Sequence, residues 1–131
     1  MAEHSDARRW APAVWAGSLL IVVLASLWPE GNRLDAATGT VWWNMGHVPA
    51  YAVLTMLTLT VAEQRFPVTP GRLVWLSAGL ALLGMLMEVL QPYFGRTADV
   101  VDAIYNVIGI LLALGSFYVS RWWRGAQHRA D

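Results

Sequence analysis

Polar and ionisable side chains gather in one stretch of an otherwise strongly apolar chain, at Glu88, Gln91, Arg96, Asp99, Asp102 and Asn106, with Gly109 just beyond. Glu88 lies within an apolar segment of residues 73–94 and Asn106 within another of residues 104–123. Each segment is long enough to cross about 30 Å of hydrocarbon, where ionisable groups are costly and by default functional. The stretch therefore predicts a binding or catalytic site.

An earlier apolar segment, residues 41–62, contributes His47 and, one helical turn later, Tyr51. If this helix enters the membrane near its first residue, His47 lies about 9 Å deep. If the helix of residues 73–94 leaves the membrane at its last residues, Glu88 lies about 8 Å deep on the same side. The two side chains are therefore expected at matched depth.

The remaining polar residues follow helical spacing. Gln91 shares a face with Glu88 at i, i+3, and Asn106 shares a face with Asp102 at i, i+4. Arg96 lies in the short connection directly above. Three helices are expected to form a shallow polar cup that faces the extracytoplasmic side.

The chemistry of these groups separates into two kinds. An imidazole can act as a base or nucleophile, and a carboxylate can orient it or exchange a proton; the candidate catalytic residues are His47, Glu88 and Asp102. A guanidinium can hold a phosphate or carboxylate in two hydrogen bonds; the candidate substrate-binding residues are Arg96, Gln91, Tyr51 and Asn106. A histidine with carboxylates could also hold a divalent metal, but no tight metal-binding motif is present. No metal ligand is assigned, and the cofactor is unknown.

Structural interpretations compete with these roles. Glu88 could pair with Arg96 and fasten helices together, and a buried asparagine such as Asn106 more often fastens helices than binds a ligand. Asp102, at a helix start, could cap that helix, and Asp99 is expected to be a solvated loop residue. Small residues that let helices approach closely are expected at Gly79, Gly84, Gly109 and Gly115.

Composition identifies the class of protein. The chain has 131 residues, of which 56% are hydrophobic and 14% charged, and its mean hydropathy is +0.43. Its zero net charge gives no reason to expect nucleic acid as a partner, and the lack of cysteine excludes disulfides and thiolate chemistry. We predict an all-α membrane protein, a single domain over residues 1–131 that forms a four-helix transmembrane bundle with helices at about 10–28, 41–62, 73–94 and 104–123.

Arginines and tryptophans predict how this bundle is oriented. Seven arginines flank the same ends of the segments, at Arg8, Arg9, Arg65, Arg72, Arg121, Arg124 and Arg129, whereas Arg33 and Arg96 lie in the other connections. The positive-inside rule then places both termini in the cytoplasm. Tryptophans mark the same limits, at Trp10, Trp75, Trp122 and Trp123 inside and at Trp28, Trp42 and Trp43 outside. Residues 10–28 could alternatively imitate a signal peptide, but the apolar run is long and Trp28 ends it.

The spacing of the polar residues resembles that of the VanZ-like family of small bacterial membrane proteins. The resemblance covers residues 42–115: a His and a Tyr one turn apart, then E-x-x-Q, G-R, D-x-x-x-N and a Gly, matched here by His47, Tyr51, Glu88, Gln91, Arg96, Asp102, Asn106 and Gly109. Many members carry an acidic-basic pair before the histidine. Here Trp43 and Asn44 stand at those positions, so the charge is not kept.

The resemblance implies a multi-pass protein of the bacterial cytoplasmic membrane, in a family whose founding member is linked to low-level teicoplanin resistance. We expect it to act on or bind an outer-leaflet lipid phosphate or a lipid-linked cell-wall precursor, with membrane lipids as partners. Whether it is an enzyme, and whether it forms oligomers, stays open. The alternative is a non-enzymatic scaffold or partner-binding module whose polar residues lock the helices.

Overall fold

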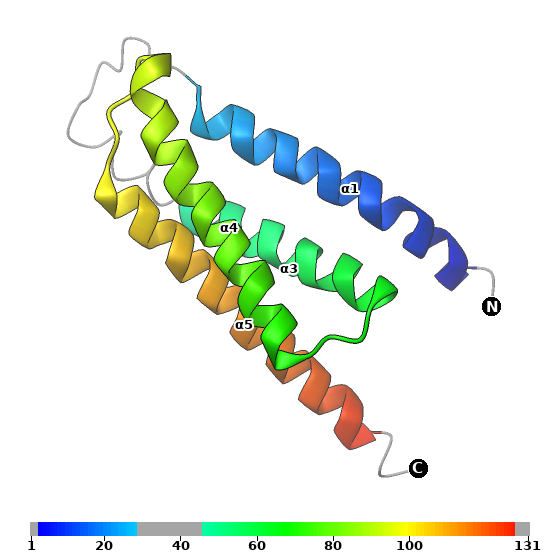
Figure 1. Cartoon of the computed structure of the whole chain (residues 1–131). Coiled ribbons are helices and arrows are strands. Elements are labelled where there is room, and N and C mark those ends of the chain that lie inside the picture. The colour runs from blue at the N-terminus through cyan, green and yellow to red at the C-terminus, as the bar shows by residue number, and fades with distance from the viewer. Residues whose placement is uncertain (1–2, 29–45, 128–131) are drawn as a thin grey trace.

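The computed structural model describes residues 3–28 and 46–127, and within these ranges the chain is helical without strands. Among the described residues there are four α-helices, and each runs antiparallel to the next one described (Figure 1). Their bounds are α1 Glu3–Ser26, α3 His47–Arg65, α4 Pro70–Leu90 and α5 Val100–Gln127, and a short 3-10 helix, η1 Gln91–Phe94, continues α4. The prediction of an all-α protein is confirmed.

The helix ends follow local chemistry. Thr69 caps α4 by accepting a hydrogen bond from the Arg72 amide at 3.3 Å, and Pro70 occupies the first turn, where its missing N–H is not needed. At the other end Pro92 lacks the amide that an α-helical hydrogen bond requires, and the chain tightens into η1. Gly95 then adopts a left-handed conformation, with φ of 74°, which glycine tolerates best. This turn places Arg96 beside the other polar residues.

The helix starts predicted at residues 10, 41, 73 and 104 differ from the observed starts at Glu3, His47, Pro70 and Val100. Two of these differences affect site residues. The helix expected over residues 41–62 has its N-cap at Gly46, so His47 is the first helical residue rather than one that lies a turn or more inside; residues 41–45 lie outside the described part of the chain. The helix expected from residue 104 begins at Val100, which puts Asp102 inside its first turn. Both starts were misplaced because hydropathy marks where an apolar stretch begins, and this point differs from where the helix begins.

The core lies between α3 and the other three helices. The most extensive packing joins α3 to α5, and α3 also contacts α1 and α4. One apolar cluster contains Val22, Tyr51, Leu54, Leu80 and Ile110, and a second contains Leu59, Leu73 and Phe117. The helix α3 therefore occupies a central position that positions His47 against α5.

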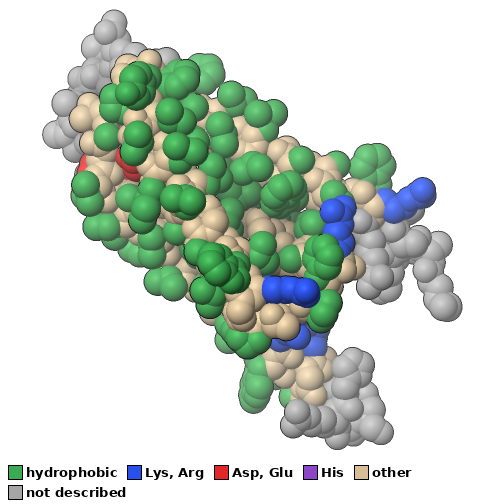
Figure 2. All heavy atoms as spheres, viewed as in Figure 1, with side chains coloured by type: hydrophobic (Ala, Val, Ile, Leu, Met, Phe, Trp, Pro, Cys, Tyr) green, Lys and Arg blue, Asp and Glu red, His purple; other side chains and the backbone are tan. Residues whose placement is uncertain are grey.

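The outer surface of the bundle is apolar. Figure 2 shows hydrophobic side chains over much of the visible face, and large ones such as Val74, Leu82 and Leu111 are 67%, 67% and 59% exposed. A soluble protein rarely exposes so much contiguous apolar surface. Within the described ranges, three stretches are long and apolar enough to cross a membrane, namely Arg9–Ser26, Pro70–Phe94 and Val100–Gln127. The chain is therefore compatible with a membrane protein that has at least these three spans.

Candidate functional site: a buried polar cluster

The predicted site residues converge at one end of the bundle. All seven candidates from the sequence are buried and come from α3, α4, η1, α5 and the connection before α5: His47, Tyr51, Glu88, Gln91, Arg96, Asp102 and Asn106. None of them is more than 8% exposed. The polar residues thus form a closed cluster rather than the shallow open cup that the sequence predicts. Burial from water strengthens electrostatic interactions among them.

His47 lies at the centre of the contacts. Its Nδ1 lies 3.1 Å from Asn106 Oδ1, and its Nε2 lies 3.4 Å from Asp102 Oδ2. Asp102 and Asn106 are one turn apart on α5, so their predicted common face is confirmed and it points at α3. This arrangement fixes the imidazole ring between an amide and a carboxylate.

Arg96 holds three parts of the chain together. Its Nη1 donates a 2.9 Å hydrogen bond to the carbonyl oxygen of Ser26, the last residue of α1, and its Nη2 lies 3.5 Å from Asp102 Oδ2. The last carbonyl groups of a helix lack partners within the helix and carry partial negative charge, so a guanidinium there is favourable. The Arg96 side chain is 1% exposed. Arg96 therefore engages protein groups rather than an open ligand pocket.

Glu88 connects α4 to the start of α5. Its Oε1 accepts a hydrogen bond from Gln91 Nε2 at 3.2 Å, which confirms the predicted shared face. Its Oε2 accepts from the Asp99 amide at 3.1 Å. Asp99 lies in the connection before α5, as predicted for a loop residue, and is half-buried; its side chain also accepts from the Val101 amide at 2.8 Å and so caps the first turn of α5.

Two glycines make room for the cluster. A Cβ on Gly84 would lie 2.9 Å from Asn106 Nδ2 and 3.3 Å from the Tyr51 hydroxyl, and a Cβ on Gly109 would lie 3.1 Å from Tyr51 Cβ. Gly79 and Gly115 have nothing within 4 Å of the same position, so close helix packing at those two is not found in the described chain.

A pocket opens beside His47 between α1 and α3, with a volume of about 210 Å³. Its walls are mainly apolar, and the lining residues are Val22, Ala25, Ser26, Gly46, His47, Ala50 and Tyr51. A second apolar hollow of about 320 Å³ shares Val22 and Ala50 with it and continues along the same two helices. Together they form a groove, here called the α1/α3 groove, that leads from the apolar surface to His47.

Sequence reasoning missed the contribution of α1. Ser26 contacts Arg96 through its main-chain carbonyl, and Ala25 and Val22 form one wall of the groove. A carbonyl group carries no residue-type signal, and an apolar wall residue in a membrane helix looks like any other. Comparison of the chain with protein families, with curated proteins and with solved structures found no match.

Proposed function

We propose that this chain is a VanZ-like protein of the bacterial cytoplasmic membrane that binds, or acts on, a lipid phosphate or a lipid-linked cell-wall precursor of the outer leaflet. The observation that carries the proposal is the α1/α3 groove, whose apolar walls end at His47. An amphipathic ligand needs an apolar channel for its chain and a polar group for its head, and the groove joins the two. An effect on teicoplanin susceptibility would follow indirectly from a change in such a lipid.

The proposal includes four membrane-spanning helices and cytoplasmic termini. Exposed arginines gather at the end of the molecule where both termini lie (Figures 1 and 2), with described members Arg9, Arg65, Arg72, Arg121 and Arg124. The polar cluster lies at the opposite end, next to η1. Positive charge flanking the cytoplasmic ends of spans supports this orientation, and α3, antiparallel to α4, would provide the fourth span.

The orientation can be tested directly because the chain contains no cysteine. Tyr93 is 82% exposed beside the polar cluster, and Gly125 is exposed at the arginine-rich end. A membrane-impermeant maleimide added to intact cells should label the Tyr93→Cys variant and leave Gly125→Cys unlabelled until the cells are opened. The reverse labelling pattern would show that the polar cluster faces the cytoplasm and would contradict an outer-leaflet ligand.

In this proposal each residue of the cluster has a different role. His47 lines the groove, together with Ser26 and Tyr51, and its imidazole meets the head group. Asp102 orients the imidazole and, with Glu88, provides carboxylates for proton transfer. Arg96 supplies positive charge behind the imidazole, through its field rather than by direct contact, since it is already bound to Ser26 and Asp102.

Lipid mass spectrometry of bacterial envelopes tests the function. Cells expressing the wild type at matched abundance should show a change in one lipid or precursor species that His47→Ala and Glu88→Gln abolish. Glu63→Gln is the matched control, because Glu63 forms only partly exposed ion pairs with Arg121 and Arg124 at the other end of the bundle. Identical lipid profiles for the wild type and both cluster variants would contradict the proposal.

The groove has its own test. Ala25 is exposed and lines the pocket, so Ala25→Leu should partly fill the groove and weaken the lipid effect without disturbing the core. Ala78→Leu places the same extra volume at an exposed position on α4 that does not line either hollow. Equal lipid effects for the two variants would show that the groove does not hold the ligand.

A second candidate function is a non-enzymatic module whose polar residues lock the helices, and the Arg96 contacts with Ser26 and Asp102 favour it. It predicts that Glu88→Gln and Asn106→Ala lower thermal stability in detergent, while no lipid species changes with the wild type. Partner capture would then replace lipid analysis as the assay of function.

A further inference from the structure

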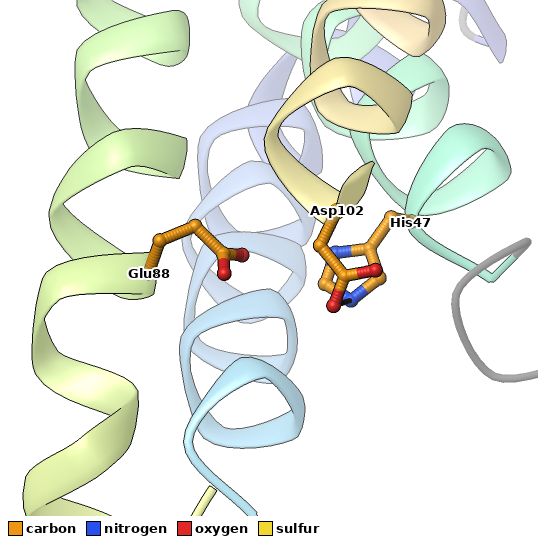
Figure 3. Close-up of side chains that lie close together, drawn as sticks. All are labelled: His47, Glu88 and Asp102. Atoms are coloured by element: carbon orange, nitrogen blue, oxygen red, sulfur yellow. Dashed lines mark ion pairs between the residues drawn. The ribbon is translucent and has the colours of Figure 1, made fainter. Parts of the chain in front are cut away.

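We propose that His47, Glu88 and Asp102 form a binding site for a divalent metal cation and that their geometry suits Zn²⁺. One ligand atom from each residue lies within 4.8 Å of the other two. Figure 3 shows the Glu88 carboxylate extending from α4 toward Asp102 and the His47 ring. A tetrahedral zinc site with metal–ligand bonds of 2.0–2.2 Å separates its ligand atoms by roughly 3.3–3.6 Å. The 3.4 Å between His47 Nε2 and Asp102 Oδ2 matches one edge of that tetrahedron, and Glu88 offers a carboxylate oxygen within 4.8 Å as the third ligand.

The orientation of the His47 ring supports this assignment. Asn106 Oδ1 can only accept a hydrogen bond, so the 3.1 Å contact places a proton on His47 Nδ1. A metal-binding histidine almost always donates its other ring N–H in this way, which fixes the ring and leaves the second nitrogen for the metal. Nε2 faces the Asp102 carboxylate, so a cation could bind both atoms.

Gln91 provides an independent observation. Its side chain is completely buried, and its amide nitrogen donates to Glu88 Oε1 at 3.2 Å. The amide oxygen of the same group is buried without a hydrogen-bond partner. An unpaired buried acceptor is costly, and carbonyl oxygens are ligands for divalent cations. Gln91 therefore brings an unused buried acceptor next to Glu88, which a bound cation could satisfy.

The α1/α3 groove ends at the proposed metal site, because His47 lines it. A zinc ion there could polarise a phosphoryl oxygen of an anionic head group. The metal site itself does not rest on the proposed lipid function. Zinc binding is measured without any lipid, so a failure of either proposal can be recognised separately.

Equilibrium dialysis of purified protein against buffered Zn²⁺, followed by elemental analysis, measures the binding. The protein should carry an affinity tag without histidines. The wild type should bind about one Zn²⁺ per chain, and His47→Ala and Asp102→Asn should weaken binding at least about tenfold. Asn106→Asp retains an acceptor for Nδ1–H and should keep the site, and Glu63→Gln should bind like the wild type.

X-ray absorption spectroscopy of the zinc-loaded wild type tests the ligand set without depending on any variant. It should show nitrogen and oxygen ligands with the multiple scattering of one imidazole. Three results would overturn the proposal: no stoichiometric zinc in the wild type, bound zinc without an imidazole signature, or unchanged zinc affinity in a folded His47→Ala variant.

Discussion

Gly109→Ala perturbs the helix contact on which the polar cluster depends. A Cβ at this position would clash with the backbone carbonyl oxygen of Val48, lie 3.0 Å from the Ala52 backbone nitrogen and lie 3.1 Å from Tyr51 Cβ. The first two atoms belong to the backbone of α3, which cannot rotate away as a flexible side chain does. The methyl group can therefore be accommodated only if α3 and α5 move apart.

The cost of this movement can be estimated from two opposing effects. Adding a methylene-sized group to a well-packed core costs about 1–3 kcal/mol, and a backbone clash belongs at the upper end. Alanine gains about 0.5–1 kcal/mol over glycine in a helix interior. The net loss of stability is about 2 kcal/mol, which corresponds to a decrease in Tm of roughly 6–12 °C for a chain of this size.

Gly115→Ala is the matched control, because it makes the same substitution in the same helix at a position with nothing within 4 Å. Thermal unfolding in detergent should show a lower Tm for Gly109→Ala and an unchanged or slightly raised Tm for Gly115→Ala. Gly109→Ala should also weaken zinc binding, because His47 moves away from Asp102. Equal Tm values for the two variants would refute the inferred close contact between α3 and α5.

Three other substitutions test the packing and the charges by denaturant titration. Arg96→Met should lower the free energy of unfolding by about 3–5 kcal/mol, because it removes the guanidinium that lies beside buried Asp102; adding Asp102→Asn should recover much of that loss. Trp15→Phe removes a 2.9 Å hydrogen bond from the indole N–H to Thr58 Oγ1 and should cost about 1 kcal/mol. Glu63→Gln, in partly exposed ion pairs, should change stability by less than about 1 kcal/mol. If the loss of unfolding free energy were largest for Glu63→Gln and smallest for Arg96→Met, the burial assigned to these side chains would be contradicted.

The sequence was sufficient to predict which polar residues meet. Intramembrane polar groups avoid lipid, and helical spacing places Gln91 beside Glu88 and Asn106 beside Asp102. The side chains of α3, α4 and α5 could then satisfy one another only by facing a shared interior. This inference needs only the residue types and the helical repeat, so it can be made from a single sequence.

Contacts that depend on the path of the backbone could not be predicted from the sequence. The contact of Arg96 with the carbonyl oxygen of Ser26 involves a group that every residue carries. The Asp99 amide donates to Glu88 while its side chain caps α5, and both contacts depend on the path of the connection after Gly95. Gly109 and Gly115 look alike in sequence, and only the crossing of α3 and α5 makes one of them indispensable.

Among the described α-helices, α3 is the one that is not apolar enough to be a candidate membrane span, and its neighbours explain why. This helix contacts α1, α4 and α5, so less of its surface needs to face lipid. Two of its threonine hydroxyls are satisfied internally: the Thr58 hydroxyl donates to the Leu54 carbonyl oxygen while accepting from Trp15, and the Thr60 hydroxyl donates to the Met56 carbonyl oxygen. A helix enclosed by other helices can carry an imidazole at its end without exposing it to hydrocarbon. The one described α-helix that is not among the three apolar candidate spans is therefore suited to hold His47 at the centre of the polar cluster.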